Sequence, residues 1–109
     1  MANVFQRVDA ALGTGFATAY TVPGSTTAIL IGLRLTNIDG TNSVNVEVKC
    51  GASGSTRHLI GVGTPLPAGS SLSCLEGGEK LVLEAAEIIE VKASATGDAE
   101  AQISILEIS

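Results

Sequence analysis

Few side chains in this sequence could carry out catalysis. Nucleophilic catalysis needs a serine or cysteine, a base within hydrogen-bond reach and an oxyanion donor. The one histidine, His58, follows Arg57 inside an apolar stretch and has no catalytic motif around it. The Gly-Ala-Ser-Gly-Ser segment at residues 51–55 lacks the Gly-x-Ser-x-Gly spacing that exposes a nucleophilic serine. We therefore predict that the protein is not an enzyme, and that Arg57 and His58 are surface residues able to contact a partner.

The sequence also gives little support for a metal or cofactor. Cys50, His58 and Cys74 could supply three ligands, but no Cys-x-x-Cys or His-x-x-x-His pair sets up a tetrahedral site. The Asp-Gly-Thr-Asn segment at residues 39–42 carries too few charges for calcium and is typical of a β-turn. We predict no cofactor and no metal. Cys50 is interpreted as a reduced core residue, and a disulfide with Cys74 stays open as an alternative.

The composition is that of one small, apolar and acidic domain. The chain has 109 residues, which suffices for a single core. Its net charge of −5 argues against nucleic-acid binding, and its aromatic content of 3% argues against sugar-binding platforms. No segment has the pattern of a signal peptide or approaches the roughly 20 apolar residues of a membrane span. We therefore expect cytosolic synthesis and no membrane partner.

The apolar content is high for a small monomeric domain. Apolar residues make up 45% of the chain and the mean hydropathy is +0.40. A small fold buries only about 60 to 70% of the surface of its unfolded chain, so part of this apolar surface would remain exposed in a monomer. Contacts between subunits would cover it. We predict a homo-oligomer, with a trimer as the guess for its order.

Alternating apolar residues predict that the central part of the chain is β. In residues 28–35 and 44–50 apolar side chains recur at every second position, which is the period of a strand. The expected inward face of the first strand carries Ile29, Ile31, Leu33 and Leu35. The Asn-Ile-Asp-Gly-Thr-Asn segment at residues 37–42 is rich in turn-forming residues. We therefore predict an antiparallel hairpin at the centre of the domain.

Further strands recur roughly every ten residues, with turn residues between them. They are expected at residues 16–22, 56–62, 72–75, 80–84, 88–95 and 99–108, with turns at residues 63–71 and 76–79. In the last strand the apolar residues change face after Ile105, which indicates a bulge or an end covered on both faces. The predicted fold class is all-β, as an antiparallel β-sandwich or jelly-roll-like barrel in a single domain.

The first 15 residues differ from the rest. Gly13 and Gly15 form a joint, so residues 1–15 are interpreted as a flexible N-terminal arm ahead of a β-sandwich over residues 16–109. An arm that docks on a neighbour and a frayed terminus or edge strand are equally open interpretations. The arm residues expected to contact a partner are Phe5, as an apolar anchor, and Arg7, as a donor of charge-assisted hydrogen bonds.

Several short segments resemble a known group of proteins. They are Tyr-Thr-Val-Pro-Gly at 20–24, Leu-Thr-Asn at 35–37, the alternating valines at 44–48, Leu-Pro-Ala-Gly-Ser-Ser-Leu at 66–72 and Leu-Val-Leu-Glu-Ala at 81–85. In this order, over residues 20–109, they resemble small β-rich virion proteins of tailed bacteriophages. One position departs from the group, because Ala86-Glu87 stands where a Gly-Asp pair commonly follows the leucine-rich strand.

The resemblance implies a structural protein of the virion with no active site. Within that group we favour a capsid decoration (cement) protein, made in the host cytoplasm and carried on the capsid surface, with the major capsid protein or another virion protein as its partner. A tail, neck or fibre-adaptor component is the first alternative, and a ligand-binding, lectin-like β module is the second. Copy number separates the first two, because a cement protein is present on the order of hundreds of copies per particle. Glycan binding through loop residues would identify the third.

Overall fold

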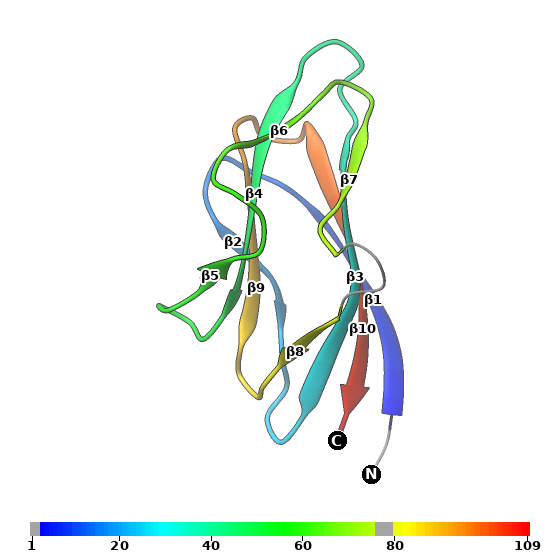
Figure 1. Ribbon diagram of the computed structural model, residues 1–109, viewed down its shortest axis with the longest axis vertical. Coiled ribbons are helices and arrows are strands. Elements are labelled where there is room, and N and C mark those ends of the chain that lie inside the picture. The colour runs from blue at the N-terminus through cyan, green and yellow to red at the C-terminus, as the bar shows by residue number, and fades with distance from the viewer. Residues whose placement is uncertain (1–2, 76–79) are drawn as a thin grey trace.

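The computed structural model describes residues 3–75 and 80–109, and all regular structure in these ranges is β (Figure 1). The prediction of an all-β fold is confirmed, while the turn expected at residues 76–79 lies outside the described residues. The strands are β1 (Asn3–Ala11), β2 (Ala17–Thr21), β3 (Thr27–Asn37), β4 (Val44–Gly51), β5 (Arg57–His58), β6 (Thr64–Leu66), β7 (Ser71–Ser73), β8 (Leu81–Leu83), β9 (Ile88–Ala93) and β10 (Ala99–Ile108).

The strands form two antiparallel sheets that face each other. Sheet A has the order β1-β10-β3-β7, with β8 also paired to β3, and lies on the right in Figure 1. Sheet B has the order β2-β9-β4-β5, with β6 also paired to β4, and lies on the left. The predicted β-sandwich in one domain is therefore confirmed.

The core between the sheets is aliphatic and follows the predicted alternation in most strands. Val44, Val46, Val48 and Cys50 of β4 all face inward, as expected. Strand β10 alternates in the same way and buries Ala99, Ala101, Ile103 and Ile105 completely, each at 0% exposure. Each large side chain buried in this way contributes about 1.5 to 3 kcal/mol relative to an exposed one.

The predicted central hairpin is wrong in its pairing. Strand β3 belongs to sheet A, where it pairs with β10, β7 and β8, whereas β4 belongs to sheet B, where it pairs with β9, β5 and β6. The connection between them crosses from one sheet to the other at the top of Figure 1. The physical reason is that two apolar faces cover each other only when their strands lie in opposing sheets, whereas neighbours in one sheet point the same way.

The turn residues predicted at 37–42 shape this crossing. Asn37 is only 1% exposed, and its amide Nδ2 donates to the backbone carbonyl oxygens of Asn42 and Leu66, each at 3.0 Å. Its Oδ1 accepts from the N–H of Asp39 at 2.9 Å. Asp39 in turn accepts from the N–H of Thr41 at 2.8 Å, which lowers the pKa of its carboxyl group. These bonds replace the ladder that a hairpin would have supplied.

A β-bulge changes the face of β3. The register of β10 on β3 shifts between Ser104 and Ile105, and Ile31 is the extra residue. The buried side chains of β3 are Ala28 and Leu30 before this point and Leu33 and Leu35 after it. The bulge predicted in the last strand is therefore wrong in its position, because the extra residue is on β3 and β10 keeps its alternation, with Ile105 inward and Leu106 outward. The predicted inward face of β3 is wrong for Ile29 and Ile31, which point outward as a result.

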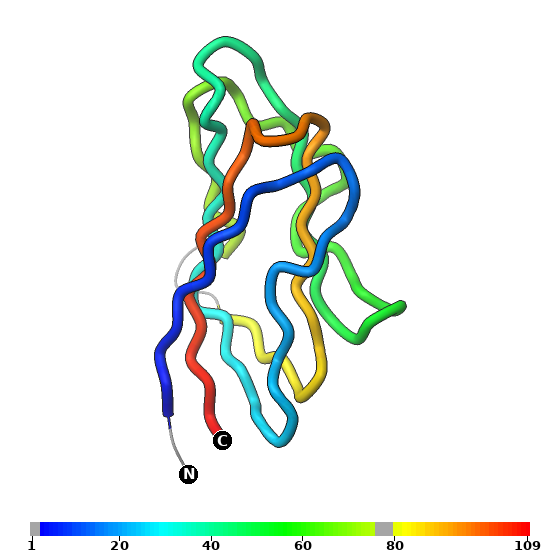
Figure 2. The backbone as a smooth tube through the Cα atoms, turned by 180° about the vertical axis from the view of Figure 1, so that it is seen from behind, coloured from blue at the N-terminus to red at the C-terminus, as the bar shows by residue number. Residues whose placement is uncertain are grey.

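Residues 3–11 form an edge strand of sheet A, which is one of the two interpretations left open for this segment, and they do not lie outside the sandwich as an arm. Strand β1 pairs with β10 over nine residues without a register shift. Leu12 follows it and is 1% exposed, and its N–H donates to the carbonyl of Ala99 at 2.9 Å. Beyond Leu12 the chain crosses to sheet B and enters β2 (Figure 2). The N-terminal segment is held by its ladder with β10, which pairs backbone groups over nine residues.

The segment after β4 differs from its prediction. The strand expected at residues 56–62 is only Arg57–His58, and the turn expected at residues 63–71 contains β6. Leu66 provides the reason for β6, because its side chain is 2% exposed and fills the core opposite Val44. Pro65 is tolerated because β6 pairs with β4 alone, so the missing N–H falls on the outer edge.

Candidate interaction surfaces

The four predicted contact residues lie on two different sheets. Phe5 and Arg7 belong to β1 of sheet A, and Arg57 and His58 belong to β5 of sheet B. All four are exposed. The structure therefore does not bring them together, and each pair has its own set of neighbours.

On β1 the odd-numbered side chains point to the outer face of sheet A, while Val8 and Ala10 pack against the core. Phe5 is 73% exposed, which is unusual for so large an apolar side chain. Arg7 Nε lies 3.4 Å from Asp9 Oδ1, with side-chain exposures of 69% and 56%. Because so exposed an ion pair contributes little to stability, both charged groups are available to a partner.

Phe5 is the first member of an apolar row across the outer face of sheet A. It lies opposite Leu106 of β10, which lies opposite Ile29 of β3, which lies opposite Val82 of β8. Val82 is 60% exposed, and the two central residues are half-buried. Side chains opposite each other on one face are in contact, so the row is continuous and roughly 14 Å long for strands about 4.8 Å apart. We call these four residues the apolar row.

A shallow hollow lies beside the apolar row on the same sheet. It has a volume of about 320 Å³ and is lined by Gly32, Arg34, Ser73, Gln102, Ser104 and Leu33. The hollow forms where Gly32 has no side chain and Ser104, its partner across β3 and β10, has a small one. Arg34 Nη2 donates to Gln102 Oε1 at 2.7 Å along its rim.

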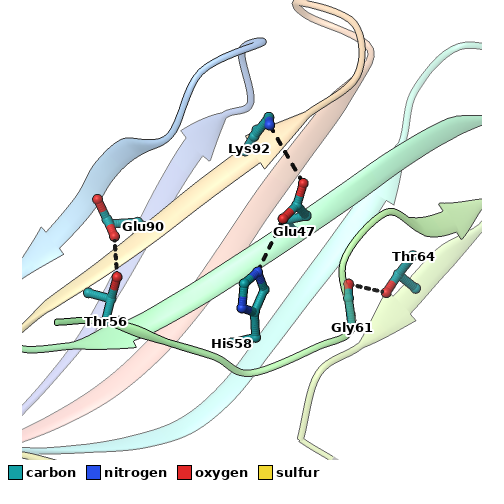
Figure 3. A network of polar contacts seen from close by, with 7 residues as sticks. All are labelled: Glu47, Thr56, His58, Gly61, Thr64, Glu90 and Lys92. Atoms are coloured by element: carbon teal, nitrogen blue, oxygen red, sulfur yellow. Dashed lines mark hydrogen bonds and ion pairs between the residues drawn. The ribbon is translucent and has the colours of Figure 1, made fainter. Parts of the chain in front are cut away.

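The outer face of sheet B carries a polar network, shown in Figure 3. Glu47 of β4 contacts two side chains, with Oε1 at 3.2 Å from His58 Nε2 and Oε2 at 3.6 Å from Lys92 Nζ. Nearby, the Thr56 hydroxyl donates to Glu90 at 2.8 Å. These groups satisfy one another across three strands, so His58 is explained by its neighbours in the sheet. Arg57 is exposed at the end of this network, opposite Cys50.

Phe16 completes the sheet B face. The ammonium groups of Lys49 and Lys92 lie 5.0 and 5.4 Å from the centre of its ring, which is the range of a cation–π contact. The ring is 37% exposed. The sequence predicts Phe16 only as a strand residue, and nothing in its immediate surroundings indicates this role, because both lysines come from distant strands.

Both cysteines are free, buried thiols. Burial raises the pKa of Cys50 to about 11 and that of Cys74 to about 12, and the neighbouring Cys50 adds to the effect at Cys74. Thiolate is the reactive form, so these thiols are unreactive at neutral pH. This agrees with the interpretation of Cys50 as a core residue.

One carboxylate joins the two sheets at the end where the chain termini lie. Glu107 of β10 accepts from the Tyr20 hydroxyl at 2.5 Å and from Gln6 Nε2 at 2.9 Å. Burial, followed by the bond to Glu107, raises the pKa of Tyr20 above its usual range. The bridge ties β1, β10 and β2 together and so supports the strand that carries Phe5.

Within residues 3–75 and 80–109, no group of three or more His, Cys, Asp or Glu side chains is arranged to hold a metal ion. The same part of the chain contains no helix of the length and apolarity needed to span a membrane.

Several solved structures have a fold similar to that of this chain. The chain is similar to one from Bacillus endospore appendages, which are disulfide-linked pili, with 14% identity, a TM-score of 0.58 and coverage of 99% of this chain and 87% of that chain. It is also similar to a chain of the acidic stable capsid of Helicobacter pylori bacteriophage KHP30, with 8% identity, a TM-score of 0.54 and coverage of 100% and 94%. A third similar chain comes from the T13 IBDV viral particle, with 9% identity and a TM-score of 0.50, and this protein spans only 30% of its length. No protein-family model and no curated protein matches the sequence.

At these identities the likeness concerns the fold alone. The fold is one used by structural subunits of virus capsids and of a pilus. This agrees at a coarse level with the resemblance to virion structural proteins.

The members of the apolar row that sequence reasoning missed are Ile29, Leu106 and Val82. Each belongs to an alternating run and was assigned to a strand, but none was predicted as part of an exposed row. The change of face at Leu106 was the one signal in the sequence, and it was interpreted as a bulge or a covered end. Cross-strand register was needed to show that Phe5 stands next to Leu106 and is one of four apolar neighbours.

Proposed function

We propose that the protein is a virion structural subunit, and specifically a capsid decoration protein that binds the major capsid protein on the capsid surface. The observation that carries this proposal is the apolar row, in which Phe5 and Val82 are 73% and 60% exposed at its two ends. Large apolar side chains gathered on one face mark sites of contact with other proteins. The likeness to a phage capsid chain supports the same class of partner.

The strand order supports the description of this subunit as a jelly roll. If β5 with β6 and β7 with β8 each count as one strand, the ten strands within the described residues reduce to eight, and the sheet orders become 1-8-3-6 and 2-7-4-5. Successive strands then lie in opposite sheets at every step except from the fourth to the fifth, as in two interlocked Greek keys. This winding is suited to a rigid subunit, because most connections tie one sheet to the other.

The apolar row is suited to cementing a shell. Its members are fixed by ladder bonds on β1, β10, β3 and β8, so little conformational entropy is lost when a partner covers them. Complete burial of one such side chain is worth about 1.5 to 3 kcal/mol, and the residues here are already partly covered. A single copy would thus bind modestly, and stabilisation of a shell would come from many copies.

The experiment is cryo-electron microscopy of the virion, combined with binding of purified protein to undecorated particles. We expect hundreds of copies on the capsid exterior with the apolar row facing the shell. The double variant Phe5→Ser/Val82→Ser should bind at least about tenfold more weakly, since two anchors are lost. Val62→Ser is the matched control, because Val62 is 75% exposed but lies between β5 and β6 on the other sheet. Equal loss in the control, or absence of the chain from the capsid, would refute the proposal.

A tail, neck or filament component is the second candidate, and the likeness to the pilus chain favours it. The same microscopy separates the two, because a tail component would be present in few copies at one vertex. The lectin-like alternative has no supporting observation in the described residues.

A further inference from the structure

Strand β1 is an edge strand that lacks the usual protection against pairing with another strand. It is nine residues long, and its register on β10 is unbroken. It contains no proline, no lysine and no bulge, which are the common means of blocking an exposed edge. Its two charged residues, Arg7 and Asp9, have opposite signs, so they do not repel every incoming strand.

The backbone of β1 presents its groups to this edge at the odd-numbered residues. Leu12, just after the strand, donates its N–H to Ala99 and accepts from the N–H of Gly97, so both of its backbone groups face the β10 side. Alternate residues of an antiparallel strand direct both groups to the same side. The even residues of β1 therefore face β10, and Phe5, Arg7 and Asp9 direct their N–H and C=O groups outward.

The edge that best matches β1 is β1 of a second copy. The opposite edge of sheet A is divided between β7 and β8, which have three residues each. At the edges of sheet B, β2 has five residues with a register shift, and β5 and β6 have two and three. In a head-to-tail contact with one of these short edges, many of the outward N–H and C=O groups of β1 would have no partner. Two β1 strands, by contrast, match in length.

Charge and side-chain direction select one register. The outer faces of the two copies stay aligned only if odd residues pair with odd and even with even. Centring the antiparallel pair on Val8 places Arg7 opposite Asp9 of the second copy, and Asp9 opposite Arg7, so that two ion pairs form. Centring it on Arg7 or on Asp9 would instead place like charges opposite each other. We propose that the protein forms a two-fold dimer through β1, with Val8 of each copy on the axis.

This dimer would present both apolar rows in the same direction, because the two-fold axis of a continuous sheet is perpendicular to it. The ten strands of the two A sheets would form one sheet, with a row on either side of the axis. If the proposed function holds, both rows can contact one capsid surface, and binding gains from two linked sites. The dimer itself is tested on purified protein alone, so either proposal can fail without the other. It would replace the trimer guessed from the composition.

The test is the mass of the full-length protein in solution, by light scattering after size exclusion over a range of micromolar concentrations. We expect twice the monomer mass of 11.0 kDa. Arg7→Asp places two pairs of facing carboxylates across the axis, and Asp9→Arg places two pairs of facing guanidinium groups there. Each variant should weaken the dimer at least about tenfold. An equimolar mixture of the two variants should recover a heterodimer, because every carboxylate of the first variant at positions 7 and 9 then faces a guanidinium group of the second.

Arg34→Asp is the matched control, since Arg34 lies on the same outer face but in the centre of the sheet. It should leave the dimer unchanged. Recovery on mixing also shows that the single variants are folded. If either fails to fold, amide exchange of the wild type decides, because the N–H groups of Phe5, Arg7 and Asp9 should be protected in the dimer. A monomer, a trimer, a dimer that resists both charge reversals, or rapid exchange of these three amides would overturn the proposal.

Discussion

Asn37 provides a sharp test of how the two sheets are joined. Replacing it with Ala removes two donors and one acceptor and leaves the carbonyl oxygens of Asn42 and Leu66 and the N–H of Asp39 without this partner. A typical hydrogen bond contributes about 0.5 to 1.5 kcal/mol net, and a buried group left unpaired costs somewhat more. With three bonds and a side chain only 1% exposed, we expect the free energy of unfolding to fall by about 2 to 4 kcal/mol.

Urea denaturation followed by circular dichroism measures this loss. Asn37→Asp keeps the acceptor for Asp39 but loses both donors and places a charge against two carbonyl oxygens, so it should destabilise the protein more than Asn37→Ala. Asn42→Ala is the control, because its side chain makes only an exposed 3.2 Å bond to Asp39, and its carbonyl is retained. A cost below about 0.5 kcal/mol for Asn37→Ala, or the same cost in the control, would show that the crossing does not depend on this amide.

Two further predictions concern stability. Burial raises the pKa values of Cys50 and Cys74 from 9.0 to about 11 and about 12, so above pH 9 the unfolded state releases protons that the folded state retains. The stability that the two protonated thiols contribute is complete below pH 9. It is lost as the pH rises through their pKa values in the folded state, on the order of 1 kcal/mol per pH unit for each thiol. Urea midpoints under reducing conditions should therefore fall more steeply with alkaline pH than in Cys50→Val/Cys74→Val, and parallel curves would contradict this. Tyr20→Phe removes the 2.5 Å bond to Glu107 and should cost about 1.5 to 3 kcal/mol, measured by the same urea titration, with an unchanged midpoint as the contrary result.

Sequence periodicity was sufficient for the elements whose signal is local. The alternating residues of β4, β9 and β10 predicted their positions and their inward faces, because a strand with one buried face must repeat every two residues. The all-β class followed from the same signal, and the single core followed from the length of 109 residues. Phe5 and Arg7, which the sequence predicts as partner contacts, are exposed, although their strand was interpreted as an arm.

Only the tertiary structure decided which strands are neighbours. The partners of β3 and β4, the bulge at Ile31 and the docking of β1 on β10 depend on contacts between residues far apart in sequence. A pattern of period two is the same whether its strand pairs with the next strand or faces it from the opposite sheet, and it does not reveal where an extra residue shifts the face. The apolar row exists for this reason: Phe5, Leu106, Ile29 and Val82 are brought side by side by register alone, and each by itself resembles an ordinary strand residue.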